Sequence, residues 1–161
     1  MNTAYLLIGG NLGNRKENLL TAISLINEQC GSLTKSSSIY ETEAWGKTDQ
    51  PSFLNQALEI STSLNARQLL RRILNIEKAM GRIRNEKLGP RIIDIDILLY
   101  GNEIHDLRFL KIPHPEMQNR RFVLVPLAEI DAALQHPVLK KTIAELLEEC
   151  PDNLDVKKVT E

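Results

Sequence analysis

The sequence predicts an α+β domain in which helices pack on an antiparallel sheet and extra elements follow at the C-terminal end. Two observations predict it. Segments with strand and helix patterns follow one another as strand, helix, strand, strand, helix, strand, the order of a split β-α-β unit and so of a ferredoxin-like α/β sandwich. The chain has 161 residues, 42% hydrophobic and 25% charged, which suits one compact domain spanning residues 1–161.

A strand and a helix open the chain. Residues 4–8 form a short apolar run that ends at glycines, typical of a buried strand followed by a turn. The helix predicted over residues 14–31 begins at Asn14 as its N-cap, with Glu17 three residues later as in a capping box, and Gly31 ends it.

Two further strands are predicted over residues 33–40 and 53–61, joined by the loop 41–52. In the second strand the side chains alternate, so that one face carries Leu54, Gln56, Leu58 and Ile60. The opposite face carries Phe53, Asn55, Ala57 and Glu59.

The remaining elements are a helix over 65–80, capped by Asn65, a strand over 92–100, and helices over 124–134 and 142–150. No repeat or linker interrupts them.

Composition limits the partners. With 20 basic and 21 acidic residues the net charge is −1, which gives no broad positive field for nucleic acid. The N-terminal apolar stretch is too short for a signal peptide or membrane span, and Cys30 and Cys150 have no metal-binding spacing. We therefore expect a cytoplasmic monomer without a nucleic-acid or membrane partner.

Two carboxylates stand out in the strand 92–100. Asp94 and Asp96 share a face with Ile92 and Leu98, about 7 Å apart along the strand. The opposite face is predicted to carry Ile93, Ile95, Ile97 and Leu99. Carboxylates on an apolar strand need a cationic partner. That partner is either Mg²⁺, bound together with substrate phosphate oxygens, or a nearby arginine such as Arg91 in a structural ion pair.

The segment 82–91 precedes these carboxylates and carries four basic residues and one acidic residue in ten positions. Arginine and lysine bind polyphosphates, and basic residues beside metal carboxylates are what phosphoryl transfer requires. Glu77 lies on the buried stripe of its helix and needs a partner, either a basic residue or a ligand. Phe53 and Asn55 could together hold a planar heterocycle, by stacking and by amide hydrogen bonds.

The chain lacks a G-x-x-x-x-G-K-[ST] loop and a G-x-G-x-x-G fingerprint, so side chains and metal must hold any nucleotide. Pro113-His114-Pro115 presents one histidine, and Asn119-Arg120-Arg121-Phe122 adds two arginines and an aromatic ring.

These motifs together resemble the 6-hydroxymethyl-7,8-dihydropterin pyrophosphokinases of folate biosynthesis. The resemblance covers the chain to about residue 135 and includes residues 5–13, 50–55, Glu77, 89–97, 113–115 and 119–122. Its most specific string is G-P-R-x-x-D-x-D-[IL], at Gly89 to Ile97. Phe109 and Lys111 stand where a known family member has arginine and threonine, so part of its triphosphate contact set differs here, and Lys111 or Arg108 could substitute.

The resemblance implies transfer of pyrophosphate from ATP to the hydroxymethyl group of the dihydropterin, which releases AMP. It implies catalytic roles for Arg82, Arg91, Asp94 and Asp96, the two aspartates being ligands of two Mg²⁺ ions. It implies pterin binding by Thr42, Glu43, Ala44, Trp45, Phe53, Asn55 and Phe122, with the rings of Phe53 and Phe122 on either side of the pterin. It implies nucleotide binding by Glu77, Arg84, Ile97, Lys111, His114 and Arg120.

Two other functions use the same features. One is a different two-metal nucleotidyl or phosphoryl transferase, which would release ADP or orthophosphate. The other is a ferredoxin-like binding module without catalysis, whose ligand affinity would not depend on Mg²⁺ or on the aspartates.

Overall fold

The structure is a computed structural model that describes residues 1–43, 50–81 and 91–159. Its strands are β1 (Asn2–Gly10), β2 (Ser32–Ser36), β3 (Tyr40–Thr42), β4 (Phe53–Thr62), β5 (Asp94–Tyr100), β6 (His105–Leu107), β7 (Leu110–Ile112) and β8 (Lys157–Lys158). Its helices are α1 (Arg15–Gln29), α2 (Ala66–Ala79), α3 (Arg121–Asp131), α4 (Ile143–Glu149) and the short 3₁₀ helix η1 (Met117–Asn119).

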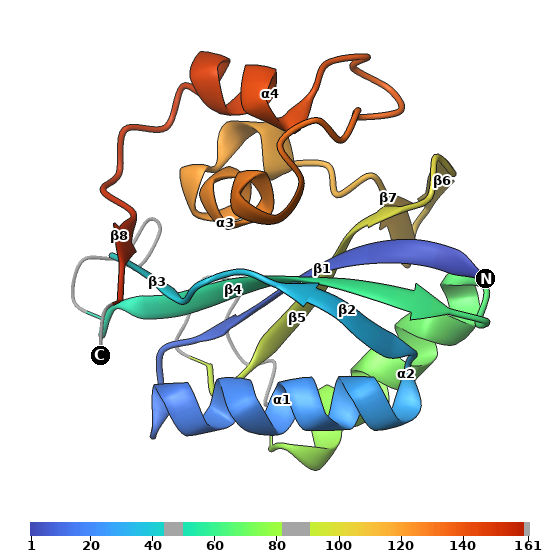
Figure 1. The fold of residues 1–161 in the computed structure, drawn as a ribbon. Coiled ribbons are helices and arrows are strands. Elements are labelled where there is room, and N and C mark those ends of the chain that lie inside the picture. The colour runs from blue at the N-terminus through green and yellow to red at the C-terminus, as the bar shows by residue number, and fades with distance from the viewer. Residues whose placement is uncertain (44–49, 82–90, 160–161) are drawn as a thin grey trace.

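One antiparallel sheet organises the molecule (Figure 1). The strand order is β5-β1-β4-β3-β8, β2 also pairs with β4, and β6 and β7 form a separate hairpin. Strand β1 lies between β4 and β5, so the first strand of the chain is an interior strand of the sheet. The predicted sheet with helices packed on it is confirmed.

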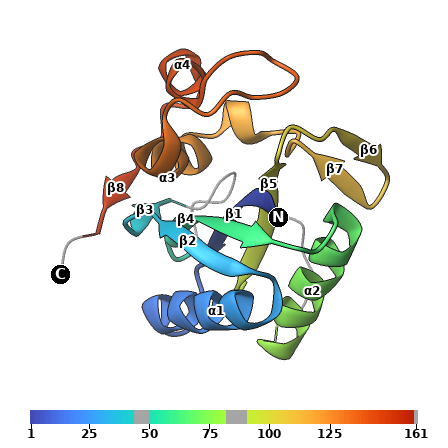
Figure 2. The ribbon, with the colours of Figure 1, turned by 45° about the vertical axis from the view of Figure 1, so that its right-hand side comes forward.

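Each face of the sheet is covered by different helices. Helices α1 and α2 lie on one face, and α3 and α4 lie on the other (Figures 1 and 2). The larger apolar core fills the α1 and α2 side, and a second cluster fills the α3 and α4 side. Because α3 does not extend over the whole sheet, part of the second face is left for a site.

The predicted starts of α1, α2 and α4 are confirmed by their caps. The side chain of Asn14 accepts a hydrogen bond from the backbone N–H of Glu17. Asn65 and Gln68 form a complete capping box at α2, as do Thr142 and Glu145 at α4.

The strand that carries the aspartates differs from its prediction beyond Ile97. The register between β1 and β5 shifts, because Leu6 pairs with Ile97 whereas Tyr5 pairs with Leu99, and this inserts one extra residue into β5. Leu99 therefore packs in the second cluster and not, as predicted, beside Ile97. Ile92 precedes β5 and packs against the larger core, so its predicted place beside the aspartates is also wrong.

The boundaries of two other predicted elements differ from the prediction. The predicted strand 33–40 is interrupted and becomes β2 and β3. Helix α3 begins at Arg121 instead of residue 124, because the carboxylate of Asp152 accepts the Arg121 N–H. Within the part of the chain that the structure describes, no helix combines the length and the apolar composition that crossing a membrane requires.

Candidate active site

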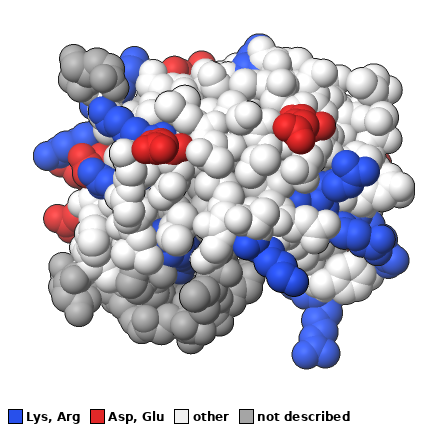
Figure 3. Space-filling model, turned by 90° about the horizontal axis from the view of Figure 1, so that it is seen from below, with Lys and Arg blue, Asp and Glu red and all other residues white. Residues whose placement is uncertain are grey.

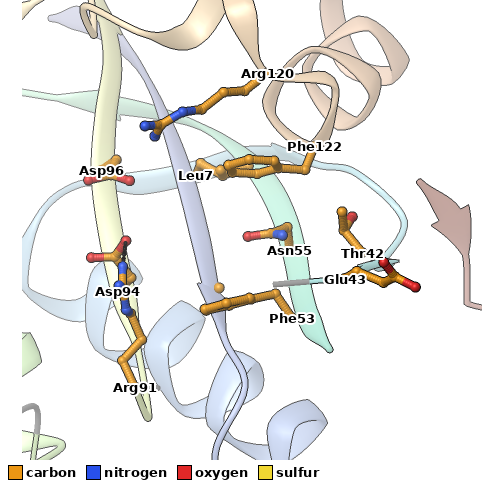
Figure 4. A pocket seen from close by; sticks show the side chains of 11 residues that line it. Leu7, Thr42, Glu43, Phe53, Asn55, Arg91, Asp94, Asp96, Arg120 and Phe122 are labelled. Carbon is orange, nitrogen blue, oxygen red and sulfur yellow. Dashed lines mark hydrogen bonds and ion pairs between the residues drawn. The ribbon is translucent and has the colours of Figure 1, made fainter. Parts of the chain in front are cut away.

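A cavity opens on the α3 face of the sheet, beside the C-terminal end of β1 (Figure 4). It is lined by Leu7, Gly9, Thr42, Glu43, Phe53, Asn55, Arg91, Asp94, Asp96, Arg120 and Phe122. The structure thus brings together nine of the predicted site residues, and it adds Leu7 and Gly9, which the sequence did not single out.

Sheet register explains why the polar groups meet. Gly9 on β1 is paired with Asn55 on β4 and with Asp94 on β5, so the amide and the first carboxylate lie on either side of a residue that has no side chain. A Cβ on Gly9 would lie 2.2 Å from Asn55 Oδ1 and 2.8 Å from the backbone oxygen of Leu54. Glycine at this position therefore gives the Asn55 amide its space.

Two aromatic rings bound the cavity. Figure 4 shows the Phe122 ring on one side and the Phe53 ring on the other, with the Asn55 side chain at a level between them. The guanidinium carbon of Arg91 lies 5.6 Å from the Phe53 ring centroid, and that of Arg120 lies 5.8 Å from the Phe122 centroid. Each ring thus has an arginine against it, within the range of cation–π attraction.

One of the two carboxylates, Asp94, lies directly beside Arg91 (Figure 4). Arg91 Nη1 is 3.3 Å from Asp94 Oδ2, and both side chains are largely buried. The structural ion pair considered from the sequence is therefore present at Asp94. It does not exclude a metal, because a carboxylate has two oxygens and further lone pairs.

Asn11 connects the segments on either side of the site and was not predicted as a functional residue. Its side chain is buried, with 2% of its surface exposed. Its Oδ1 accepts the N–H of Arg91 at 2.9 Å, and its Nδ2 donates to Gln50 Oε1 at 3.1 Å and to the Pro51 carbonyl at 3.0 Å. The only signal in the sequence is its position directly after two glycines at the end of a strand.

One hydroxyl in the cavity wall has no partner. Among the described residues, Thr42 Oγ1 is the one buried side-chain nitrogen or oxygen atom without a hydrogen bond. Leaving such a group unsatisfied costs about 1–3 kcal/mol, so a ligand that bonds to it gains that amount.

A second cavity lies beside the first, and Asp96 lines both. Its lining residues are Leu70, Leu74, Ile95, Asp96, Ile97, Arg108, Phe109, Leu110, Lys111, His114 and Pro115. Three residues predicted to bind nucleotide, Ile97, Lys111 and His114, are therefore together, whereas Arg120 lines the first cavity. Lys111 Nζ also forms an ion pair of 2.8 Å with Asp106.

His114 is in its neutral form near neutral pH. Burial, and then the positive charge of Arg120, lower the pKa of His114 below its ordinary value. Its Nδ1 accepts the backbone N–H of Glu116 at 3.2 Å, which leaves the proton on Nε2. The ring is thus a neutral hydrogen-bond donor at the second cavity.

Glu77 lines neither cavity. It is 2% exposed, and its Oε2 accepts the N–H of Ile95 at 2.7 Å, which connects α2 to the strand between the two aspartates. This contact supports a structural role for Glu77, in which its buried carboxylate is satisfied by the protein itself. Its nucleotide-binding role stays a prediction. The predicted site residues Ala44, Trp45, Arg82 and Arg84 lie outside the described residues.

The oxygen ligands present fit Mg²⁺. The described residues contain no group of three or more His, Cys, Asp or Glu side chains that could hold a metal by themselves. Mg²⁺ needs no such group, since it is commonly held by one or two carboxylates together with substrate phosphates and water. Asp94 and Asp96 provide two carboxylates on one wall of a cavity that also holds basic side chains.

The fold and the cavity together define a ferredoxin-like α+β domain suited to transferring a phosphate-containing group to a flat molecule. A family model described as 7,8-dihydro-6-hydroxymethylpterin-pyrophosphokinase (HPPK) matches residues 5–132. The chain belongs to this family.

Two relatives named 2-amino-4-hydroxy-6-hydroxymethyldihydropteridine pyrophosphokinase agree with this assignment. The relative from Bacillus subtilis is 47% identical over 130 residues, covering 80% of this chain and 78% of its own length. The relative from Aquifex aeolicus is 43% identical over 145 residues, covering 90% of each chain.

Among solved structures, the HPPK-DHPS protein of Plasmodium falciparum aligns with a TM-score of 0.73 at 20% identity. The alignment covers 92% of this chain and 43% of that chain. At this identity the likeness shows the fold alone.

Proposed function

We propose that this chain transfers the pyrophosphoryl group of ATP to the hydroxymethyl oxygen of 6-hydroxymethyl-7,8-dihydropterin, a step of folate biosynthesis, at the cavity between Phe53 and Phe122. The observation that carries this placement is the first cavity itself. It combines two ring walls, an amide and a carboxylate pair within one space.

The pterin would lie between the rings of Phe53 and Phe122. Stacking binds a flat heterocycle by its faces, and the Asn55 amide offers both a donor and an acceptor to its edge. The Thr42 hydroxyl supports this orientation, since it is buried at the cavity wall without a partner among the described residues. Glu43 also lines the cavity.

Asp94 and Asp96 would hold two Mg²⁺ ions at the triphosphate. When bound, these ions would neutralise charge on the phosphate oxygens. Arg91 and Arg120 add positive charge beside them, and the neutral His114 can donate from Nε2 to a phosphate oxygen. Transfer through a charge-dispersed transition state depends on alignment and positive charge more than on a strong base. The arrangement of two arginines, one neutral histidine and two carboxylates meets that need.

Product analysis tests the reaction. Phosphorus NMR of the complete mixture of ATP, Mg²⁺ and dihydropterin should show AMP and pterin diphosphate appearing in equal amounts. ADP or orthophosphate as the product would contradict the proposal and favour a different phosphoryl transferase.

The non-catalytic alternative has its own test. For a binding module, Asp94→Ala and Asp96→Ala would leave ligand affinity unchanged, and titrations would show no dependence on Mg²⁺. We also propose one catalytic domain over residues 1–161 that acts as a cytoplasmic monomer. Sedimentation velocity at micromolar concentration tests the oligomeric state.

A further inference from the structure

One wall of the second cavity is apolar, and of its residues only Ile97 has a predicted nucleotide-binding role. It is formed by Leu70, Leu74 and Ile97 with Phe109, which follows β6 in the hairpin. Phe109 is 60% exposed and Leu74 is 42% exposed. Single exposed apolar residues are common on protein surfaces. These two differ from that common case because they line the same cavity.

The Phe109 ring is supported from α2. The guanidinium carbon of Arg67, in the first turn of α2, lies 5.2 Å from the ring centroid. This contact joins the β6–β7 hairpin to the helix and orders a ring that is otherwise largely in solvent. A stacking surface that is ordered before the ligand arrives loses less entropy on binding.

Basic side chains lie along α2 and in the cavity that the ring lines. Helix α2 carries Arg67, Arg71, Arg72 and Lys78 on its exposed surface. Figure 3 shows Lys and Arg side chains gathered on the side of the molecule where α2 lies. Arg108 and Lys111 line the cavity itself. The cavity therefore joins an apolar wall to a basic rim, which matches a ligand with a flat apolar part and an anionic part.

We propose that Phe109 is a nucleobase-stacking residue of the ATP site. The inference rests on the proposed function, in which the triphosphate binds at Asp96. Since Asp96 lines both cavities and the first holds the pterin, the nucleoside extends into the second cavity. The Phe109 ring there receives a face of the base, and Leu70, Leu74 and Ile97 surround it.

Stacking recognises the face of a base and not its edge. The polar side chains of the described residues that line this cavity are all ionisable, namely Asp96, Arg108, Lys111 and His114. Any contact that these side chains make with the edge of a base is separate from stacking on the Phe109 ring. Phe109 therefore increases the affinity for ATP and GTP by the same factor.

The test compares Phe109→Ala with Phe109→Trp. Base–aromatic stacking is worth about 1–3 kcal/mol by alanine substitution, so Phe109→Ala should raise the KM and Kd for ATP roughly tenfold. The kcat should stay within about twofold of wild type, because the ring does not touch the transferred group. Phe109→Trp should restore the affinity.

Inorganic tripolyphosphate, titrated with Mg²⁺, separates stacking from structural effects because it has no base. Its Kd should be the same for wild type and Phe109→Ala. Ile104→Ala is the matched control, since Ile104 is 61% exposed just before the same hairpin and does not line the cavity. That variant should bind ATP like wild type.

Two results would overturn the inference. One is an ATP Kd within about twofold of wild type in Phe109→Ala. The other is an equal loss of ATP and tripolyphosphate affinity, which would mean that the hairpin had been disturbed. Failure of the proposed function would appear elsewhere, as wild-type protein that forms no AMP, and the ATP titration would still decide the role of Phe109.

Discussion

Replacing Asn11 with alanine removes the side chain that connects the two segments beside the site. The change takes away the acceptor of the Arg91 N–H and the donor to the Pro51 carbonyl and to Gln50. A buried backbone group that loses its partner costs about 1–3 kcal/mol. Pro51 is exposed, so water can replace the hydrogen bond to its carbonyl. Arg91 is only partly exposed, so water replaces the bond to its N–H less readily. We therefore expect Asn11→Ala to lose about 2–3 kcal/mol of unfolding free energy.

Activity should fall as well, because Asn11 holds Arg91 in place and fixes the chain just before Phe53. We expect kcat/KM to drop at least about tenfold for the pterin, as a small misplacement of positioning groups costs such factors. Urea denaturation, with the slope m checked for constancy, measures the stability, and initial rates at saturating ATP measure the activity.

Asn14→Ala is the control for this variant. Asn14 is an exposed N-cap, so its loss should cost about 1 kcal/mol and leave kcat/KM unchanged. If Asn11→Ala were as stable and as active as Asn14→Ala, the connecting role argued for Asn11 would be wrong.

Three further predictions follow from single contacts. Gly9→Ala should raise the KM for the pterin several-fold with a small effect on the KM for ATP, because the new Cβ would displace the Asn55 amide; equal effects on both substrates would contradict this. Glu77→Gln keeps an acceptor for the Ile95 N–H, so in urea denaturation it should cost at least about 1 kcal/mol less than Glu77→Ala, and equal losses would count against the contact. Burial lowers the pKa of His136, whose Nδ1 accepts two backbone N–H groups. The stabilising contribution of neutral His136 should therefore be fully present above the unfolded pKa of about 6.5 and decrease as pH falls below it. The unfolding free energy of His136→Asn should fall less steeply with decreasing pH than that of wild type, and an unchanged pH dependence would refute this.

The sequence predicted the elements whose signals are local. Asn14 and Asn65 cap their helices through their own side chains, and the apolar run 4–8 ends at a glycine pair. The start of α3 was missed because Asp152, which accepts the N–H of the first helical residue, comes from a distant part of the chain.

Register in β5 could not be predicted beyond Ile97. Both faces of this strand are buried there, so Leu98, Leu99 and their neighbours are apolar on either side and give no alternation from which to place a bulge.

In the candidate site, too, some residues could be predicted from local sequence patterns and others could not. Asp94, Asp96, Phe53 and Asn55 follow from strand alternation, and Phe122 followed only from the resemblance to the family. The roles argued for Asn11 and Phe109 depend on tertiary contacts, namely the bonds to Arg91 and Pro51 and the approach of Arg67. No local pattern encodes these contacts.

The most direct test of the proposed site is the single-turnover rate of Asp96→Asn, because Asp96 is the carboxylate that the two cavities share. The substitution preserves the shape of the side chain and removes its charge, so the fold should persist, which thermal unfolding verifies. With saturating ATP, Mg²⁺ and dihydropterin, the rate of AMP formation should fall at least about a hundredfold, as it should for wild type after Mg²⁺ is removed by a chelator. A folded Asp96→Asn variant that forms AMP within threefold of the wild-type rate would contradict the placement of the reaction at Asp94 and Asp96.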